Sequence, residues 1–113
     1  MSKLPEEYLR HILKETDYLT SESKSLSLDD LLKDETKMRA FARSLEIIGE
    51  AAKKVSDDFR KSHPETDWKS MAGMRDRLIH WYFGVDWEIV WDVVINEIPK
   101  LKEQVKKLIV EPI

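Results

Sequence analysis

The residues best suited to chemistry lie together in the segment 74–82, which reads Met-Arg-Asp-Arg-Leu-Ile-His-Trp-Tyr and directly follows Gly73. Arg75 carries a permanent positive charge on a planar fork that matches the oxygens of a phosphate group. His80 carries the side chain best able to take up and return a proton near neutral pH. An arginine and a histidine that act on the same phosphate can cleave a phosphodiester bond without a metal ion.

The spacing of these residues leaves two arrangements open. In an ideal helix, Arg75 and His80 point about 140° apart, because they are separated by five positions. Asp76 and His80, which are four positions apart, would share a helix face. Arg75 could reach the phosphate from the start of a helix, where its long side chain can swing round. Alternatively, a twofold homodimer could combine two copies of the segment into one composite site, and this second arrangement is the one we expect.

Each candidate has a structural alternative. Asp76 is a ready hydrogen-bonding partner for a purely structural His80, and we predict that His11 and His63 are structural or solvated. The three histidines are widely separated and lack a zinc-binding spacing, so we expect neither a metal site nor a cofactor. Arg77 and Trp81 are candidate substrate contacts, since tryptophan can stack on a base.

Composition narrows the class of protein. A chain of 113 residues forms a single domain, 1–113, and the absence of cysteine excludes disulfides and thiolate zinc sites. The sequence lacks an apolar run long enough to span a membrane and an N-terminal signal core, so we expect a cytoplasmic protein. The net charge of −3 argues against broad binding of nucleic acid and favours selected, shape-defined RNA substrates.

Hydrophobic periodicity predicts an all-α protein, an antiparallel bundle of four to five helices. The first helix is expected from Pro5 to about Leu19, and Ser27 with Asp30 resembles a capping box that opens a short second helix. The longest helical pattern runs from residue 34 to about 61. Gly49 lies in the middle of it, which predicts close approach of another helix.

The second half of the chain holds the candidate site. A helix is expected from about residue 70–73 to Phe83, with Gly84 as its stop and Asp86 as the cap of the last helix. Pro99 lies inside that last helix and should bend it. Trp87 and Trp91, with the valines beside them, predict apolar surface in excess of what one chain covers, and therefore a dimer.

Segment 74–82 resembles a known family. Arg75, His80 and Tyr82 fit the Arg-x4-His-x-Tyr motif of the HepT-like toxins, which belong to the HEPN superfamily of helical ribonucleases. The stretch 45–51, Leu-Glu-Ile-Ile-Gly-Glu-Ala, is similar to that family's central helix, and Val90-Trp91 also matches. The resemblance extends over residues 5 to 108, nearly the whole chain.

The resemblance implies a metal-independent endoribonuclease toxin whose dimer brings two motifs together in a cleft, with RNA, including transfer RNA, as the substrate. It implies catalytic roles for Arg75, His80 and Asp76. It further implies a minimal nucleotidyltransferase (MNT) partner, the antitoxin, which would neutralise the toxin by adenylylating Tyr82. The alternative is a non-catalytic, nucleotide-binding partner subunit of such a transferase, in which Arg75 and Arg77 hold a phosphate and His80 only donates a hydrogen bond.

Overall fold

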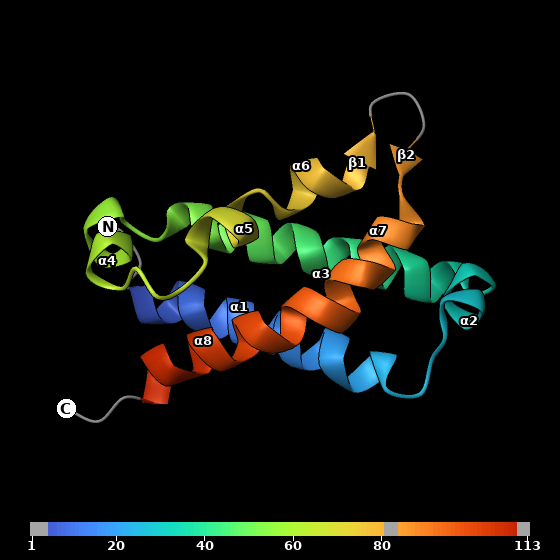
Figure 1. Ribbon diagram of the computed structural model, residues 1–113, viewed down its shortest axis with the longest axis horizontal. Helices are drawn as coiled ribbons and strands as arrows, with labels where there is room; N and C mark the ends of the chain where they lie inside the picture. Colours follow the sequence, from blue (N-terminus) through green and yellow to red (C-terminus); the bar gives the residue numbers. More distant parts are fainter. Residues whose placement is uncertain (1–4, 81–83, 111–113) are drawn as a thin grey trace.

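The computed structural model describes residues 5–80 and 84–110. Three long helices form its body: α1 (Pro5–Ser23), α3 (Glu35–Lys54) and α8 (Ile98–Val110). α1 packs along both α3 and α8, in a body that measures 45 × 31 × 25 Å (Figure 1). The all-α class predicted from the sequence is confirmed.

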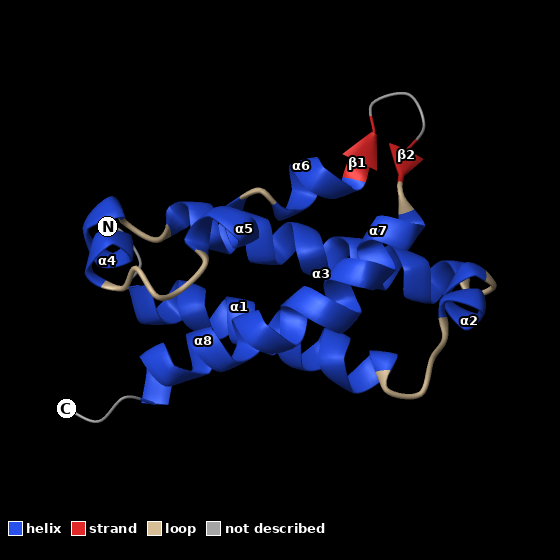
Figure 2. Ribbon diagram, in the orientation of Figure 1, coloured by secondary structure: helices blue, strands red, loops and turns tan. Residues whose placement is uncertain are grey.

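Shorter elements connect these helices. They are α2 (Leu28–Leu32), α4 (Asp57–Ser62), α5 (Trp68–Ala72), α6 (Met74–Leu78), β1 (Ile79–His80), β2 (Gly84–Val85), α7 (Trp87–Asp92) and the π-helical turn η1 (Val93–Glu97). The two strands are antiparallel and form a small ladder at one edge of the molecule (Figure 2). Among the described residues, no helix is both long enough and apolar enough to cross a membrane.

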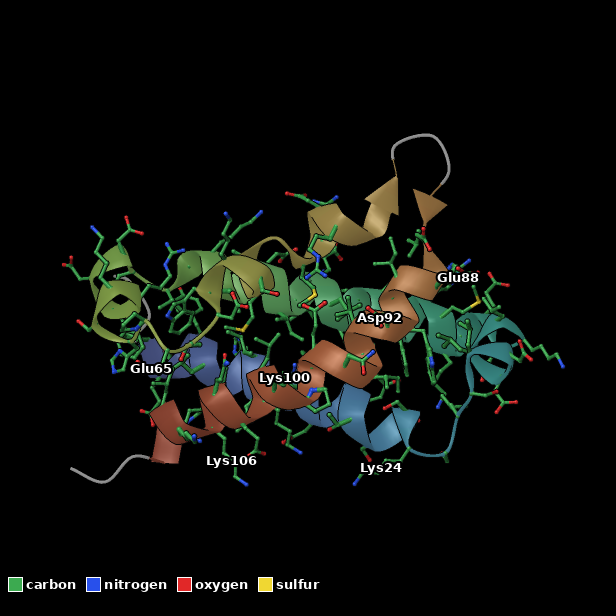
Figure 3. The ribbon with its side chains drawn as sticks, in the orientation of Figure 1. Lys24, Glu65, Glu88, Asp92, Lys100 and Lys106 are labelled. Atoms are coloured by element: carbon green, nitrogen blue, oxygen red, sulfur yellow. The ribbon has the colours of Figure 1, made fainter. Side chains whose placement is uncertain are left out.

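The core consists of the residues whose helical spacing predicted burial. The fully buried ones include Ile12, Leu19, Phe41, Leu45, Ile48, Val90, Val94, Ile98 and Val105. Charged residues such as Lys24, Lys100 and Lys106 project away from the helical body (Figure 3). Because Val90 and Val94 are covered within one chain, the excess apolar surface predicted behind the motif is smaller than the sequence suggested.

The helix predicted from residue 34 to 61 is wrong in its length. α3 ends at Lys54, since Val55 adopts an extended backbone (φ −69°, ψ 132°). The side chain of Ser56 then accepts a hydrogen bond from the backbone N–H of Phe59 and starts α4. Because Ser56 caps a new helix, it stabilises the break between α3 and α4. The apolar periodicity of the sequence does not reveal this break. The first helix is also longer than predicted and reaches Ser23.

Local signals at other helix starts were reliable. Ser27 and Asp30 form the predicted capping box at α2, and the carboxylate of Asp86 caps α7 as expected. The predicted last helix corresponds to the run α7, η1 and α8. Pro99 has no N–H to donate to the carbonyl of Ile95, and the irregularity lies just before it, as the π-helical turn Val93–Glu97.

Candidate active site

Gly49 sets the position of Arg75. A methyl group added at Gly49 would lie 3.3 Å from the carbonyl oxygen of Met71, 3.7 Å from that of Ala72 and 3.8 Å from the backbone nitrogen of Arg75. The missing side chain therefore lets the junction between α5 and α6 lie directly on α3. The close approach predicted at Gly49 is confirmed, and it places the backbone that carries Arg75.

The Arg75 guanidinium faces a carboxylate on α3. Its Nε lies 3.4 Å from Oε2 of Glu46, while the Arg75 side chain is 58% exposed. The other oxygen of Glu46 accepts a hydrogen bond from Nη1 of Arg43 at 2.8 Å. This hydrogen bond raises the pKa of Arg43 above its ordinary value. Glu46 thus lies between two guanidinium groups, and both keep donors facing solvent.

The motif segment is not one helix, contrary to the prediction from residue 70–73 to Phe83. α5 ends at Ala72, α6 ends at Leu78, and His80 lies in β1. Ile79 pairs with Val85 and His80 with Gly84, whose φ of 78° suits a residue without a side chain. Gly84 is therefore part of a returning strand rather than a helix stop.

This ladder changes the expected relation between two site residues. Asp76 and His80 do not share a helix face, because the helix ends at Leu78. Asp76 is exposed on α6. The side chain of His80, and Trp81 and Tyr82 as a whole, lie outside the described part of the structure, so their roles stay predictions.

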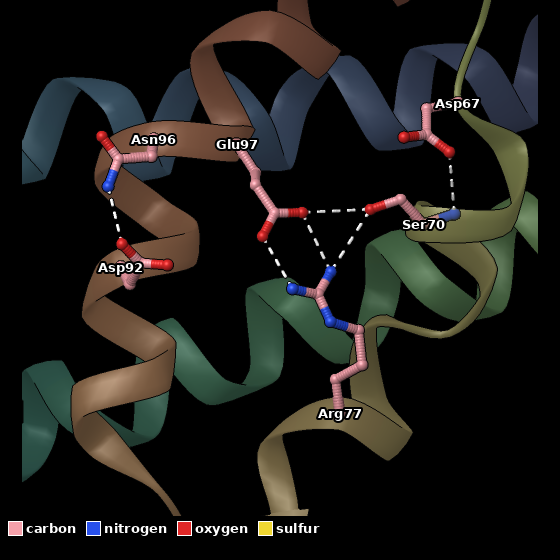
Figure 4. Close-up of polar contacts among 6 residues, drawn as sticks. All are labelled: Asp67, Ser70, Arg77, Asp92, Asn96 and Glu97. Atoms are coloured by element: carbon pink, nitrogen blue, oxygen red, sulfur yellow. Dashed lines mark hydrogen bonds and ion pairs between the residues drawn. The ribbon is translucent and has the colours of Figure 1, made fainter.

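Arg77 differs from Arg75 in its contacts, because its side chain is bonded to residues of α5 and of the π-helical turn. Its Nη1 and Nη2 donate to the two carboxylate oxygens of Glu97 at 2.9 and 2.7 Å (Figure 4). The hydroxyl of Ser70 donates to Oε1 of Glu97 at 3.1 Å. A two-point arginine–carboxylate pair is geometrically specific, which favours a structural role for Arg77 over the predicted substrate contact.

The ion pair between Arg77 and Glu97 favours the charged form of both side chains. The hydrogen bond from Arg77 lowers the pKa of Glu97 below its ordinary value; partial burial opposes this effect, and the hydrogen bond from Ser70 adds to it. The same pairing raises the pKa of Arg77. Glu97 is the last residue of the π-helical turn, and such turns are frequent at functional sites.

A cavity of about 250 Å³ opens beside Arg75, between α3, β2 and α7. We call it the arginine pocket; its lining residues are Arg39, Ala42, Arg43, Leu45, Glu46, Arg75, Val85 and Val90. Sequence reasoning missed Arg39 and Arg43. Their signal is the spacing of residues 39, 43 and 46, which places three charged side chains on one face of a helix close to Gly49.

The other two histidines were predicted to be structural or solvated. Trp68 is buried and donates from Nε1 to the carbonyl of His63 at 2.9 Å, and the His63 ring nitrogen Nδ1 lies 3.0 Å from the carbonyl oxygen of Phe59. His11 is exposed on α1. Among the side chains that the structure describes, those of residues 5–77 and 84–109, no three from His, Asp or Glu converge into a group that could hold a metal ion.

The chain is similar over most of its length to proteins named as ribonucleases. The family model described as "Ribonuclease HepT-like" matches residues 6–108. A protein of Caldanaerobacter subterraneus subsp. tengcongensis named "Putative RNase" is 50% identical over 107 residues, which cover 95% of this chain and 96% of that protein. A protein of Thermococcus cleftensis named "Probable ribonuclease HepT" is 41% identical over 108 residues, 96% of this chain and 98% of its own. No solved structure matches the chain.

Proposed function

The chain belongs to the HepT-like ribonuclease family, and we propose that it is an endoribonuclease that cleaves RNA without a metal ion. The observation that carries this proposal is the setting of Arg75. It lies in the first turn of α6, more than half exposed, beside an arginine-lined pocket and five residues before His80. A permanent cation that is anchored but open to solvent suits the binding of a phosphate group.

In the proposed reaction, His80 removes the proton of a ribose 2′-hydroxyl, and the 2′-oxygen attacks the adjacent phosphorus. The bond from phosphorus to the 5′-oxygen of the next nucleotide breaks, and that oxygen takes a proton from a second His80 or from water. The products are a 2′,3′-cyclic phosphate and a free 5′-hydroxyl. Arg75 donates two hydrogen bonds to the phosphorane oxygens as their negative charge grows.

Asp76 completes the proposed catalytic set by orienting His80 or Arg75. Its position three residues before the start of β1 supports this role, because α6 and β1 form one short, continuous segment. Arg75 already has a carboxylate partner, Glu46 on α3, so it depends less on Asp76 than His80 does.

We also propose the toxin–antitoxin setting that the family resemblance implies. A homodimer places two motif segments in one cleft, and the MNT partner, which acts as the antitoxin, neutralises the toxin by adenylylating Tyr82. Transfer RNA is the substrate class that the family suggests.

The test of cleavage uses the purified protein and RNA in excess EDTA. We expect wild type to generate 2′,3′-cyclic phosphate ends and to leave DNA intact. His80→Ala should have lost this activity. The same RNA with 2′-O-methyl groups should resist cleavage. Equal cleavage by wild type and His80→Ala would identify a contaminating nuclease and refute the proposal.

A second candidate, the nucleotide-binding partner of a transferase, is favoured by one observation. Three arginines around a cavity of about 250 Å³ could hold a nucleotide without any chemistry. On that reading the protein binds nucleotides, cleaves no RNA and does not arrest growth when expressed. Growth arrest that Arg75→Ala relieves would favour the nuclease.

A further inference from the structure

The arginine pocket concentrates positive charge on a chain whose net charge is −3. Among the lining residues that the structure describes, three are arginines and one, Glu46, is acidic. Glu46 lies within 3.4 Å of Arg75 and 2.8 Å of Arg43, so its charge is shared between these two. Arg39 pairs with Glu35, which does not line the pocket. The pocket is therefore a local site for an anion.

The floor of the pocket is apolar. Leu45 and Val90 are fully buried, and Ala42 and Val85 are half-buried beside them. A free phosphate would gain nothing from this floor, whereas a nucleobase presents a flat apolar face together with a charged phosphate. The volume of about 250 Å³ lies just below the ~300–1,000 Å³ typical of small-molecule sites, which suits one nucleotide.

The arginines of the pocket differ in how firmly they are held. Arg43 is fixed by Glu46 at 2.8 Å and by Glu50 at 3.8 Å. Arg39 is 80% exposed and is held only through its surface pair with Glu35, a kind of pair that contributes little. Arg39 can exchange this partner for a phosphate at low cost, while Arg43 offers preoriented donors.

We propose that the arginine pocket binds an unpaired RNA nucleotide next to the scissile phosphate. The base lies against Ala42 and Val85, which are backed by the buried Leu45 and Val90, and its phosphate is bound by Arg39 and Arg43. Arg75, at the edge of the same pocket, is left for the scissile phosphate. This inference rests on the proposed ribonuclease function, to which it adds a substrate subsite and a requirement for single-stranded RNA.

The requirement for an unpaired nucleotide follows from the shape of the pocket. The apolar part of the pocket lies between α3, β2 and α7, so a base can enter it only when it is not stacked and paired in a helix. Sequence-specific RNA recognition generally targets such splayed bases. Double-stranded RNA would present phosphates to Arg39 and Arg43 but could not place a base on the floor.

The experiment measures binding of a short, single-stranded 2′-O-methyl RNA to the wild-type chain by fluorescence anisotropy, over a range of salt concentrations. The 2′-O-methyl groups block the proposed attack, so binding is measured without cleavage. We expect Arg39→Ala and Arg43→Ala each to weaken binding several-fold and to lower the salt slope by about 0.7, the value for one lost contact to a single strand.

Arg10→Ala is the matched control. Arg10 pairs with Glu6 at 2.9 Å on an exposed helix face, as Arg39 pairs with Glu35 at 2.7 Å, and it does not line the pocket. Its substitution removes the same charge, so it should leave both the affinity and the salt slope close to wild type. Equal losses in Arg10→Ala and Arg39→Ala would show a general charge effect and overturn the subsite.

A second arm tests the base. Ala42→Leu fills the cavity while it keeps every arginine, and its melting temperature shows whether the chain still folds. We expect Ala42→Leu to bind the RNA more weakly than wild type. One abasic position in the RNA should weaken binding to wild type but cause no further loss in Ala42→Leu. Unchanged affinity in a folded Ala42→Leu, or equal affinity for duplex RNA, would overturn the proposal.

The two proposals fail in different ways. RNA cleavage by wild type together with unchanged substrate KM in Arg39→Ala and Arg43→Ala removes the subsite and leaves the nuclease. Pocket-dependent binding with no cleavage of any RNA removes the nuclease and leaves a nucleotide-binding site.

Discussion

Arg75 and Arg77 are two residues apart on the same short helix, yet they have opposite surroundings. Arg77 donates to both oxygens of Glu97 at 2.9 and 2.7 Å, and Ser70 donates to the same carboxylate. Among the described side chains, Arg75 has one ion pair, a longer contact of 3.4 Å to Glu46, and it is 58% exposed. One arginine has its hydrogen-bonding capacity used within the fold, and the other keeps most of its donors for a ligand.

The difference comes from what lies opposite each side chain. Arg77 faces the end of the π-helical turn, where an extra residue changes the direction in which Glu97 points. Arg75 faces the charged side of α3, where Glu46 is already shared with Arg43. The comparison suggests that Arg77 holds the motif segment in place so that Arg75 can act.

The largest effect that this comparison predicts is on activity. Arg75→Ala should lower kcat/KM on RNA by roughly 10²–10³-fold, the scale for losing one donor to a developing negative charge. Its thermal stability should stay near wild type, since an exposed side chain is replaced. Arg75→Lys should recover only part of the activity, because an ammonium group cannot donate in the two-point geometry.

Arg77→Ala provides the contrast for this prediction and should show the reverse order of effects. It leaves the Glu97 carboxylate without its partner, so stability should fall more than in Arg75→Ala, and activity should fall less. A nuclease assay and a thermal melt of both variants check the comparison. A larger loss of activity in Arg77→Ala, with unchanged stability, would show that we have assigned the two arginines the wrong way round.

Gly49→Leu should have the next largest effect, because it pushes the segment that carries Arg75 away from α3. A methyl group there already lies 3.3 Å from the Met71 carbonyl, a backbone atom that cannot rotate away. Overpacking of this kind costs about 1–3 kcal/mol, so both the melting temperature and RNA cleavage should fall. Lys53→Leu, at an exposed position of α3, should leave both near wild type. If Gly49→Leu is as stable and active as Lys53→Leu, the close approach does not position Arg75.

Sequence reasoning found what is encoded locally. The apolar stripes identified the buried faces of α1 and α3, and the side chains of Ser27 and Asp86 identified helix starts through their own hydrogen bonds. Gly49 indicated a close approach because a glycine inside a helix needs a packing reason. Residue type and spacing drew attention to Arg75 and His80, and the family resemblance added Tyr82.

What the sequence did not reveal depends on contacts between distant residues. The pairing of Ile79 with Val85 ends the motif helix at Leu78, and no local pattern predicts a ladder of two residues per strand. Arg77 and Glu97 are 20 positions apart, so their pairing follows only from the packed fold. Arg39 and Arg43 read as an ordinary solvated face until the packed fold brings β2 and α7 beside them to form the pocket.

The smallest predicted effect concerns pH, and it tests the Arg77 side of the comparison alone. The hydrogen bond from Arg77 holds the pKa of Glu97 below its ordinary value of 4.5. A carboxyl group whose pKa is depressed by folding contributes stability that is fully present above the unfolded pKa and is lost as the pH falls through the folded value. The contribution is about 1 kcal/mol or less, because solvent screens a pair whose side chains are 41% and 30% exposed.

Glu97→Gln should therefore be less stable than wild type at pH 7, with the difference shrinking as the pH falls below about 4.5, the ordinary pKa of the carboxyl group. Urea unfolding at a series of pH values measures this difference directly, with Glu35→Gln as the control, since Glu35 forms an exposed pair with Arg39. Glu97→Gln in the Arg77→Ala background should lose the pH-dependent difference, because the depressed pKa requires the guanidinium. A difference between Glu97→Gln and wild type that stays constant from pH 7 to pH 3 would mean that Glu97 acts through packing rather than charge, and the contrast between the two arginines would then lose its electrostatic basis.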